Sequence, residues 1–119
     1  MGLRLLIFIA FFMSGFSQAF NIIQNSKLNK GTSFTFEERK ATGTTGLVPR
    51  GKVNILDKVE NVMSIIRSKP SPIEKYVYLH SIQDAEESLY FAALALHTAE
   101  LMPIVYTPTV GEACQKWAQ

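Results

Sequence analysis

Acidic residues are missing from the first part of the chain. No aspartate or glutamate precedes Glu37, and residues 1–36 carry only Arg4, Lys27 and Lys30, a net charge of +3. The remaining residues hold nine basic and ten acidic side chains, so the overall charge of +2 originates in the N-terminal segment. A balance this close to neutral does not indicate nucleic-acid binding, and we expect no nucleic-acid partner.

Cysteine and glycine-rich motifs are almost absent as well. Cys114 is the only cysteine, which excludes an internal disulfide and a zinc site built on several thiols, and we expect it to be a small buried side chain. No Gly-x-Gly-x-x-Gly or phosphate-binding loop occurs, so the sequence predicts no nucleotide site. His80 and His97 have no carboxylate at helical ligand spacing, so the sequence predicts no metal site, and both histidines are expected to be partly buried or at the surface.

Residues 1–19 resemble a signal peptide. Arg4 precedes an apolar run that ends at Met13, shorter than the about 20 residues that a membrane-spanning helix needs. Ser17 and Ala19 place small residues at the third-last and last positions before a possible cleavage. We therefore expect a signal-peptide-like leader over residues 1–19, and no membrane association once it is removed.

Residues 20–36 are rich in Asn, Ser, Thr and Lys and contain no acid, which is typical of a transit-like linker. Together with the leader, this composition predicts an organellar destination. A plastid reached through a secretory-type leader is the first hypothesis, and the mitochondrion is the alternative. Plain secretion is also compatible with the leader.

Residues 37–119 carry mostly helical signals. Thr35 and Glu38 have the spacing of a capping box at the start of a short helix, and Gly43 predicts its end. Pro49 lacks a backbone donor and disfavours helix at the preceding residue, so residues 47–51 are predicted to form a turn or an extended linker.

Three further helix starts follow. Asn54 is a plausible cap for a second helix, in which apolar residues recur at spacings of four, three and four and so share one face: Ile55, Val59, Val62 and Ile66. Ser71, Pro72 and Glu74 supply a hydroxyl cap, a first-turn proline and an acid for a third helix. Residues 84–87 place carboxylates at the positive end of a fourth helix, where Glu86 and Glu87 are expected to be solvated.

The last residues mix extended and helical signals. The segment from Ile104 to Tyr106 lies between Pro103 and Pro108, which predicts one short extended strand. A final helix of one or two turns is expected from Thr109, and the sequence ends inside it without a stop signal, so we expect a truncated domain. The predicted fold class is mainly α, with that single short strand.

Tyr106 is the one candidate catalytic residue that the local sequence offers. A general acid role would require a nearby cation to lower a phenol pKa that starts at about 10. The residue pattern by itself favours the alternative, a core tyrosine at the end of a strand.

Several blocks of the sequence resemble malic enzymes, in family order and at family spacing: residues 30–39, 43–49, 71–76 and 79–84. Residues 101–111, Leu-Met-Pro-Ile-Val-Tyr-Thr-Pro-Thr-Val-Gly, resemble the family signature. The resemblance covers the chain from roughly Asn29 onward. It implies an incomplete helical N-terminal segment of the malic enzyme substrate-side domain over residues 37–119.

The resemblance also implies a function for the intact enzyme. Malic enzymes oxidise L-malate with NAD or NADP and decarboxylate enzyme-bound oxaloacetate with Mg or Mn to release pyruvate and CO₂. Tyr106 aligns with the tyrosine that protonates the enolpyruvate carbon, whereas the partner lysine, the metal-binding carboxylates and the dinucleotide-binding fold lie beyond Gln119. We therefore expect this chain to bind no cofactor or metal and to be inactive alone, with malate binding and homo-oligomer formation belonging to the intact enzyme. The alternative is a non-catalytic helical module that associates with full-length subunits.

One departure from the family predicts a regulatory difference. Animal members that are activated by fumarate carry arginines where this chain has Asn61 and Ala85. Without guanidinium groups the dicarboxylate loses its bidentate contacts. We predict that malate oxidation by the full-length parent enzyme proceeds at the same rate with and without fumarate, and a clear rise in rate would contradict this.

Overall fold

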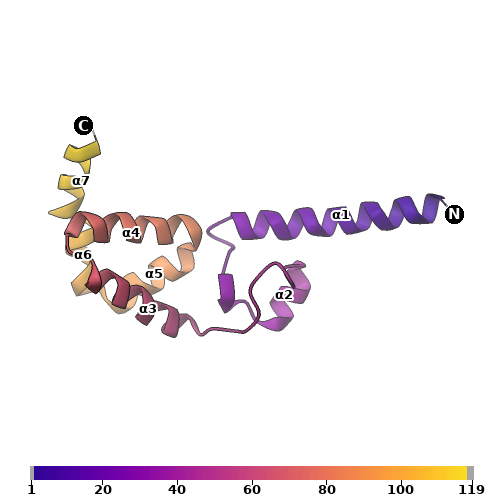
Figure 1. The fold of residues 1–119 in the computed structure, drawn as a ribbon, viewed down its shortest axis with the longest axis horizontal. Coiled ribbons are helices and arrows are strands. Elements are labelled where there is room, and N and C mark those ends of the chain that lie inside the picture. Colours follow the sequence, from indigo (N-terminus) through magenta and orange to yellow (C-terminus); the bar gives the residue numbers. More distant parts are fainter. Residues whose placement is uncertain (1, 118–119) are drawn as a thin grey trace.

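The computed structural model describes the backbone of residues 2–117, and the side chains of these residues except 2–6, 8, 11 and 12. The fold is mainly α, with principal extents of 65 × 34 × 19 Å (Figure 1). A long N-terminal helix, α1 (Gly2–Gln24), projects from one end beside a short helix, α2 (Phe36–Thr42). The other helices pack together at the opposite end: α3 (Ile55–Ser68), α4 (Pro72–Ala85), α5 (Glu87–Leu96), α6 (Thr98–Val105) and α7 (Thr109–Trp117).

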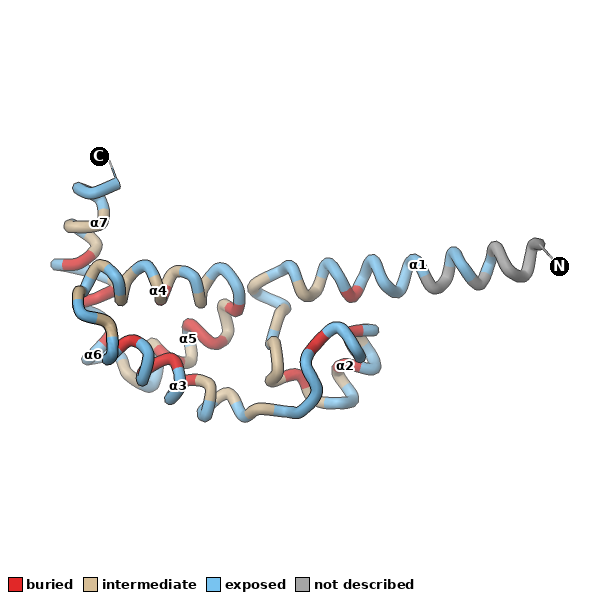
Figure 2. Tube along the Cα trace, viewed as in Figure 1, coloured by how far each residue is buried: buried red, intermediate tan, exposed pale blue. Residues whose placement is uncertain are grey.

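Helix α1 continues without a break through Ala19, the predicted cleavage position. Ala19 is fully buried, whereas most of the described side chains of α1 are exposed (Figure 2). The buried contact is made with Gly43 at the end of α2, where an added Cβ would lie 3.7 Å from the Ala19 Cβ and 3.5 Å from the Gly15 carbonyl oxygen. Helix α1 thus contacts the body of the protein through small residues, which allow close approach.

No described helix is by itself both long enough and apolar enough to cross a membrane. Taken together, α5 and residues 98–117 are long and apolar enough to cross a membrane, but the two parts are bent by 120° relative to each other.

The capping box of α2 is confirmed. The Glu38 N–H donates to the Thr35 hydroxyl at 3.1 Å, and the Thr35 N–H donates to the Glu38 carboxylate at 2.9 Å. Gly43 ends the helix with a φ of 69°, a left-handed conformation that glycine adopts without strain. The local pattern was therefore sufficient to define both ends of this helix.

The linker after α2 is held by a buried arginine that the sequence did not single out. Arg39 is 4% exposed, and its guanidinium donates only to backbone carbonyls, those of Thr32, Phe34, Pro49 and Gly51. These bonds join the 3-10 turn η1 (Gly31–Ser33) and the linker to α2. Residues 47–51 form the predicted turn and linker, but Arg39 fixes their path.

Helices α3 to α6 share one hydrophobic core. Its buried members are Val59, Val62, Met63, Ile66, Leu79, Leu89, Tyr90, Ala93, Leu101 and Ile104. The predicted face of α3 is confirmed, because three of its four apolar residues are buried and Ile55 packs against the cluster. The predicted cap of α3 is also present, since Asn54 accepts a hydrogen bond from the Leu56 N–H at 3.1 Å.

The start of α4 is as predicted, but the predicted place of Asp84 at the start of the next helix is wrong. Ser71 accepts from the Glu74 N–H at 3.3 Å, and Pro72 occupies the first turn. Helix α4 then continues to Ala85, so Asp84 lies in its last turn and not at the start of α5. The helix breaks at Glu86, whose non-helical backbone (φ −150°, ψ 84°) allows α5 to turn back and pack against α4 and α3.

The predicted strand from Ile104 to Tyr106 is wrong. Ile104 belongs to helix α6 even though Pro103 lies inside that helix. Leu101 and Ile104 are both buried, and residues three apart share a face in a helix but point to opposite faces in a strand. Burial of both side chains in the same core therefore overrides the disfavoured proline. No strand forms among residues 2–117.

Helix α7 confirms the expected final helix, but the expected burial of Cys114 is wrong. The buried residue of α7 is Thr109 in its first turn, and Cys114 is exposed. Helix α7 contacts α4 and α6 and then extends away from the core, and its residues from Cys114 to Trp117 are exposed (Figure 1).

Candidate functional site

Tyr106 lies at the junction of α6 and α7. Its N–H donates to the Met102 carbonyl at 2.9 Å and ends α6, and its own carbonyl accepts from the Val110 N–H at 2.8 Å at the start of α7. The Thr107–Pro108 peptide bond in this junction is cis. Both backbone polar groups of Tyr106 are therefore used to join the two helices, and its side chain is left to project.

The Tyr106 side chain is 62% exposed, so the alternative of a core tyrosine at the end of a strand is wrong. Its hydroxyl makes no hydrogen bond or ion pair with any residue that the structure describes. This part of the chain therefore presents a phenol on a supported turn, but does not itself provide the neighbouring cation that a general acid would require.

The support for this turn comes from buried neighbours. Leu101 and Ile104 anchor α6 in the core, and the Thr109 hydroxyl, on a residue only 3% exposed, donates to the Pro103 carbonyl at 2.7 Å. That carbonyl lies at the end of α6, where the helix leaves acceptors unpaired. Sequence reasoning identified Thr109 as a helix start but not as the residue that ties α7 to α6.

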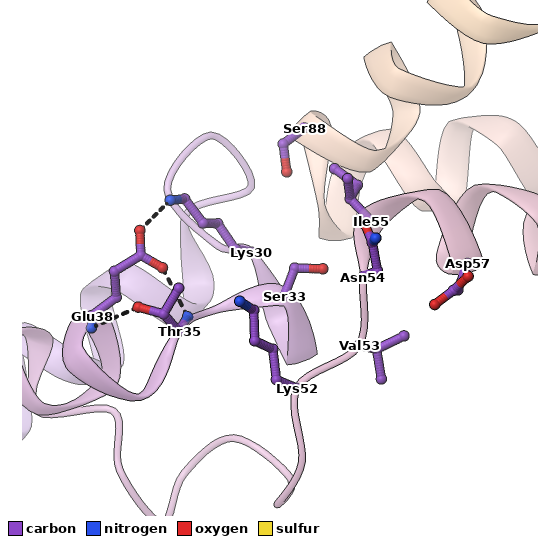
Figure 3. Close-up of a pocket in the computed structure, with 10 residues that line it drawn as sticks. All are labelled: Lys30, Ser33, Thr35, Glu38, Lys52, Val53, Asn54, Ile55, Asp57 and Ser88. Carbon is purple, nitrogen blue, oxygen red and sulfur yellow. Dashed lines mark hydrogen bonds and ion pairs between the residues drawn. The ribbon is translucent and has the colours of Figure 1, made fainter.

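A second candidate lies at the other end of the core, in a pocket of about 640 Å³ between the N-terminal segment, the start of α3 and α5 (Figure 3). Its lining residues are Lys30, Ser33, Thr35, Glu38, Lys52, Val53, Asn54, Ile55, Asp57 and Ser88. Lys30 forms an ion pair with Glu38 at 2.5 Å, and that hydrogen bond holds the pKa of the Glu38 carboxyl below its usual value. The hydroxyls of Ser33 and Ser88 are buried without a hydrogen-bond partner among the described residues.

This pocket contains two cations, Lys30 and Lys52, and two carboxylates, Glu38 and Asp57 (Figure 3). The carboxylate whose pKa is lowered, that of Glu38, is paired with Lys30. No pair of its side chains has the arrangement of a nucleophile with a base or of an acid with a base. It is a polar hollow lined by paired and unpaired polar groups.

Next to this pocket, Glu86 forms the most buried ion pair described. The expectation that Glu86 is solvated is wrong: both of its carboxylate oxygens accept from the Lys58 ammonium, at 2.5 and 2.6 Å, and the two side chains are 12% and 15% exposed. Because Glu86 occupies the break between α4 and α5, its side chain turns inward toward α3 and not outward as it would on a continuous helix. The sequence offered no signal that would connect residues 28 positions apart.

The N-terminal segment closes over this ion pair. The Glu87 N–H donates to the Ser26 carbonyl at 2.9 Å, and the Asn29 amide donates to the Ala85 carbonyl at 3.2 Å. Gly31 has a φ of 52°, and a Cβ there would lie 2.9 Å from a Glu86 carboxylate oxygen. Residues 26–31, which lie within the predicted linker, are therefore attached to the helical core. The predicted boundaries at residues 19 and 36 stay predictions.

The two histidines are partly buried, which is one of the two placements that the sequence predicted. His97 lies 3.4 Å from a Glu60 oxygen, and the His80 ring packs against Tyr76 with ring centroids 4.4 Å apart. The described residues contain no group of three His, Cys, Asp or Glu side chains that could hold a metal ion. They therefore do not fit a catalytic metal site, and we derive no chemical step through a metal.

The geometry defines a helical region that presents one tyrosine on a helix junction, and comparison with known proteins places that region in a class. Residues 83–119, which include α5, α6, α7 and Tyr106, match the family described as malic enzyme, N-terminal domain. The chain is 44% identical over 98 residues to the NAD-dependent malic enzyme of Idiomarina loihiensis, covering 82% of this chain and 17% of that protein. It is 47% identical over 103 residues to NAD-dependent malic enzyme 2 of Vibrio vulnificus, covering 86% of this chain and 18% of that protein.

A third relative, the NAD-dependent malic enzyme of Pseudomonas savastanoi pv. phaseolicola, is 40% identical over 99 residues, covering 83% of this chain and 18% of that protein. The chain therefore belongs to the malic enzyme family and corresponds to the N-terminal region of its members. It spans only 17% to 18% of the length of these curated relatives.

The Lys58–Glu86 ion pair can be tested by removing one charge. We predict that Glu86→Gln lowers the free energy of unfolding by about 2 kcal/mol, because a partly buried ammonium loses its charged partner. Glu100→Gln is the matched control: its ion pair with Arg67 is exposed, so the change should stay below about 0.5 kcal/mol. Urea titration followed by circular dichroism measures both values.

The apolar double variant Lys58→Met/Glu86→Leu should recover most of the loss, because it removes both charges together. Equal effects of Glu86→Gln and Glu100→Gln would show that the buried pair contributes nothing beyond a surface contact.

Proposed function

We propose that this chain is the N-terminal region of an NAD(P)-dependent malic enzyme, which oxidises and decarboxylates L-malate to pyruvate and CO₂. The observation that carries the proposal is the similarity to NAD-dependent malic enzymes over 82% to 86% of this chain, which includes the segment around Tyr106. The chain contains no glycine-rich dinucleotide-binding motif. In this proposal it therefore supplies only part of the enzyme, and another region binds the dinucleotide.

In this proposal Tyr106 is the general acid that protonates the carbon of the enolpyruvate left by loss of CO₂. The reaction requires a donor that is held in position and shielded from water. The junction of α6 and α7 supplies the first requirement, because Leu101, Ile104 and Thr109 hold the turn on which Tyr106 lies. Its exposed phenol leaves the second requirement, and a partner cation, to other parts of the enzyme.

The remaining parts of the proposal follow from the same assignment. NAD or NADP, Mg or Mn, and most contacts to malate belong to regions of the family outside this segment, and the intact enzyme forms a homo-oligomer. Exposed apolar side chains on the helical body are compatible with such contacts: Val77, Phe91, Leu96, Met102 and Trp117. We infer that the 119-residue chain alone has no malate-dependent activity.

A chimera tests this proposal. Residues 29–119 would replace the matching N-terminal region of the Vibrio vulnificus enzyme. We predict that the chimera reduces NAD in the presence of malate, and that Tyr106→Phe in the chimera lowers kcat by about 100-fold or more, because a phenylalanine has no proton to donate. Tyr78→Phe is the control and should leave kcat within about twofold, since Tyr78 is a partly buried residue of α4 that packs against the core.

An inactive chimera that folds and assembles would contradict the assignment, and an unchanged kcat for Tyr106→Phe would contradict the role of Tyr106. The second candidate function is a non-catalytic helical module that associates with full-length subunits, which the exposed apolar residues also support. Co-purification of the tagged 119-residue chain with the full-length Vibrio enzyme, together with an inactive chimera, would favour this function.

We further propose that residues 1–36 direct the chain to an organelle, with the plastid first and the mitochondrion second. The support is compositional: an apolar stretch after Arg4, then a segment without acids. Fusing residues 1–36 to a fluorescent protein should place the reporter in an organelle of a plastid-bearing host cell. Release of the reporter into the medium would contradict the proposal.

A further inference from the structure

Three hydrogen bonds close the junction of α6 and α7 around Tyr106. Two are backbone bonds, from the Tyr106 N–H to Met102 and from the Val110 N–H to Tyr106. The third comes from a side chain: the Thr109 hydroxyl donates to the Pro103 carbonyl at 2.7 Å and so connects the two sides of the junction across Tyr106. This third bond is the one that a substitution can remove while the backbone donors and acceptors stay in place.

The Pro103 carbonyl depends on this hydroxyl for its hydrogen bond. Helix α6 ends at Val105, so the following helical turn that would supply a donor is missing. No backbone N–H of residues 106–110 donates to the Pro103 carbonyl, and Pro108 within this segment has no N–H at all. The side chain of Thr109 therefore takes the place of a backbone donor at the end of α6.

Burial holds the two ends of this segment but not the tyrosine between them. Ile104 and Thr109 are 8% and 3% exposed, whereas residues 106–108 are all exposed. The direction of the Tyr106 side chain is therefore set by the backbone that connects the two buried ends. Apolar packing is non-directional, whereas a hydrogen bond prefers a narrow range of distances and angles. The Thr109 hydroxyl thus supplies the directional contact that fixes how α7 leaves α6.

We propose that Thr109 is a positioning residue for proton transfer by Tyr106, and that its hydroxyl acts through the Pro103 carbonyl on the direction of the phenol. This inference rests on the proposed function, in which the phenolic O–H bond of Tyr106 breaks, a C–H bond forms on enolpyruvate, and the phenolate regains a proton from water. A misplacement of about 1 Å can lower a rate by about 100-fold, so one hydrogen bond can affect the rate more than the stability of the fold.

Substitutions of Thr109 in the chimera with the Vibrio vulnificus enzyme test the effect on the reaction. Thr109→Val removes the hydroxyl and keeps the shape of the side chain. We expect kcat to fall by about tenfold or more while the KM for malate stays within about twofold, because proton transfer is misaligned but malate binding is not. Thr109→Ser retains the hydroxyl and should keep kcat within about threefold of the unsubstituted chimera. Thr109→Ala is a second variant without the hydroxyl if circular dichroism shows that Thr109→Val does not fold.

Thr98→Val is the matched control. The Thr98 hydroxyl also donates to a backbone carbonyl at 2.7 Å, that of Leu94, but at the opposite end of α6. Its removal should leave kcat and KM within about twofold, because the contacts between α6 and α7 are retained. An equal loss of kcat in Thr98→Val and Thr109→Val would overturn the positioning role, since any lost hydroxyl contact of α6 would then have the same effect.

Amide hydrogen exchange of the 119-residue chain, followed by NMR, tests the junction without any enzyme assay. The amides of Tyr106 and Val110 report opening of the junction, and the amide of Met63, a fully buried residue of α3, reports unfolding of the core. We expect Thr109→Val to speed exchange at the two junction amides by about tenfold relative to Met63. Thr109→Ser and Thr98→Val should leave this ratio within about threefold of wild type.

The two measurements distinguish failure of the positioning role from failure of the proposed function. If Tyr106→Phe lowers kcat but Thr109→Val does not, or if Thr109→Ser is as slow as Thr109→Val, the positioning role is overturned and the proposed function stands. If exchange at the junction amides rises no more than at Met63, Thr109 contributes to global stability alone, and the positioning role is again overturned. An unchanged kcat for Tyr106→Phe, or an inactive chimera that folds and assembles, overturns the proposed function and the positioning role with it.

Discussion

The arrangement of the helical body depends on the ion pair between Lys58 and Glu86. Glu86 occupies the break between α4 and α5, and its carboxylate reaches Lys58 on α3 because the chain turns at that position. Residue 31 favours glycine, because its φ is 52° and a Cβ there would lie 2.9 Å from the same carboxylate, which would have to shift. One buried pair therefore joins three helices and the segment before η1, and this arrangement allows α5 to bury its apolar face against α3 and α4.

The Tyr106 junction depends on the opposite end of the same core. Leu101 and Ile104 insert into the cluster that α3, α4 and α5 build, and Thr109 ties the beginning of α7 to the end of α6. These contacts hold the backbone of Tyr106 but leave its side chain exposed. For a chain that spans 17% to 18% of its malic enzyme relatives, an exposed but well-supported tyrosine is compatible with a site completed by other parts of the enzyme.

Features that depend on neighbouring residues were predicted well. The caps at Thr35, Asn54 and Ser71 were correct because each hydroxyl or amide acts on backbone groups two or three residues away. The prediction of a strand at Ile104 failed because proline preferences are local, whereas burial of Leu101 and Ile104 against other helices is not. The predictions for Glu86 and Cys114 failed for a related reason: partner distance and exposure depend on how elements far apart in the chain are packed.

The sequence by itself determined the mainly helical class, the starts of most helices and the family, because these depend on local spacing and on the order of short motifs. It also singled out Tyr106 as a candidate general acid, although only through the resemblance to malic enzymes. The tertiary structure decided that Tyr106 is exposed at a helix junction, that Arg39 is buried among carbonyls, and that Lys58 meets Glu86. These properties require contacts between residues distant in sequence, and such contacts are set by the packing of the core and not by the local preferences of the chain.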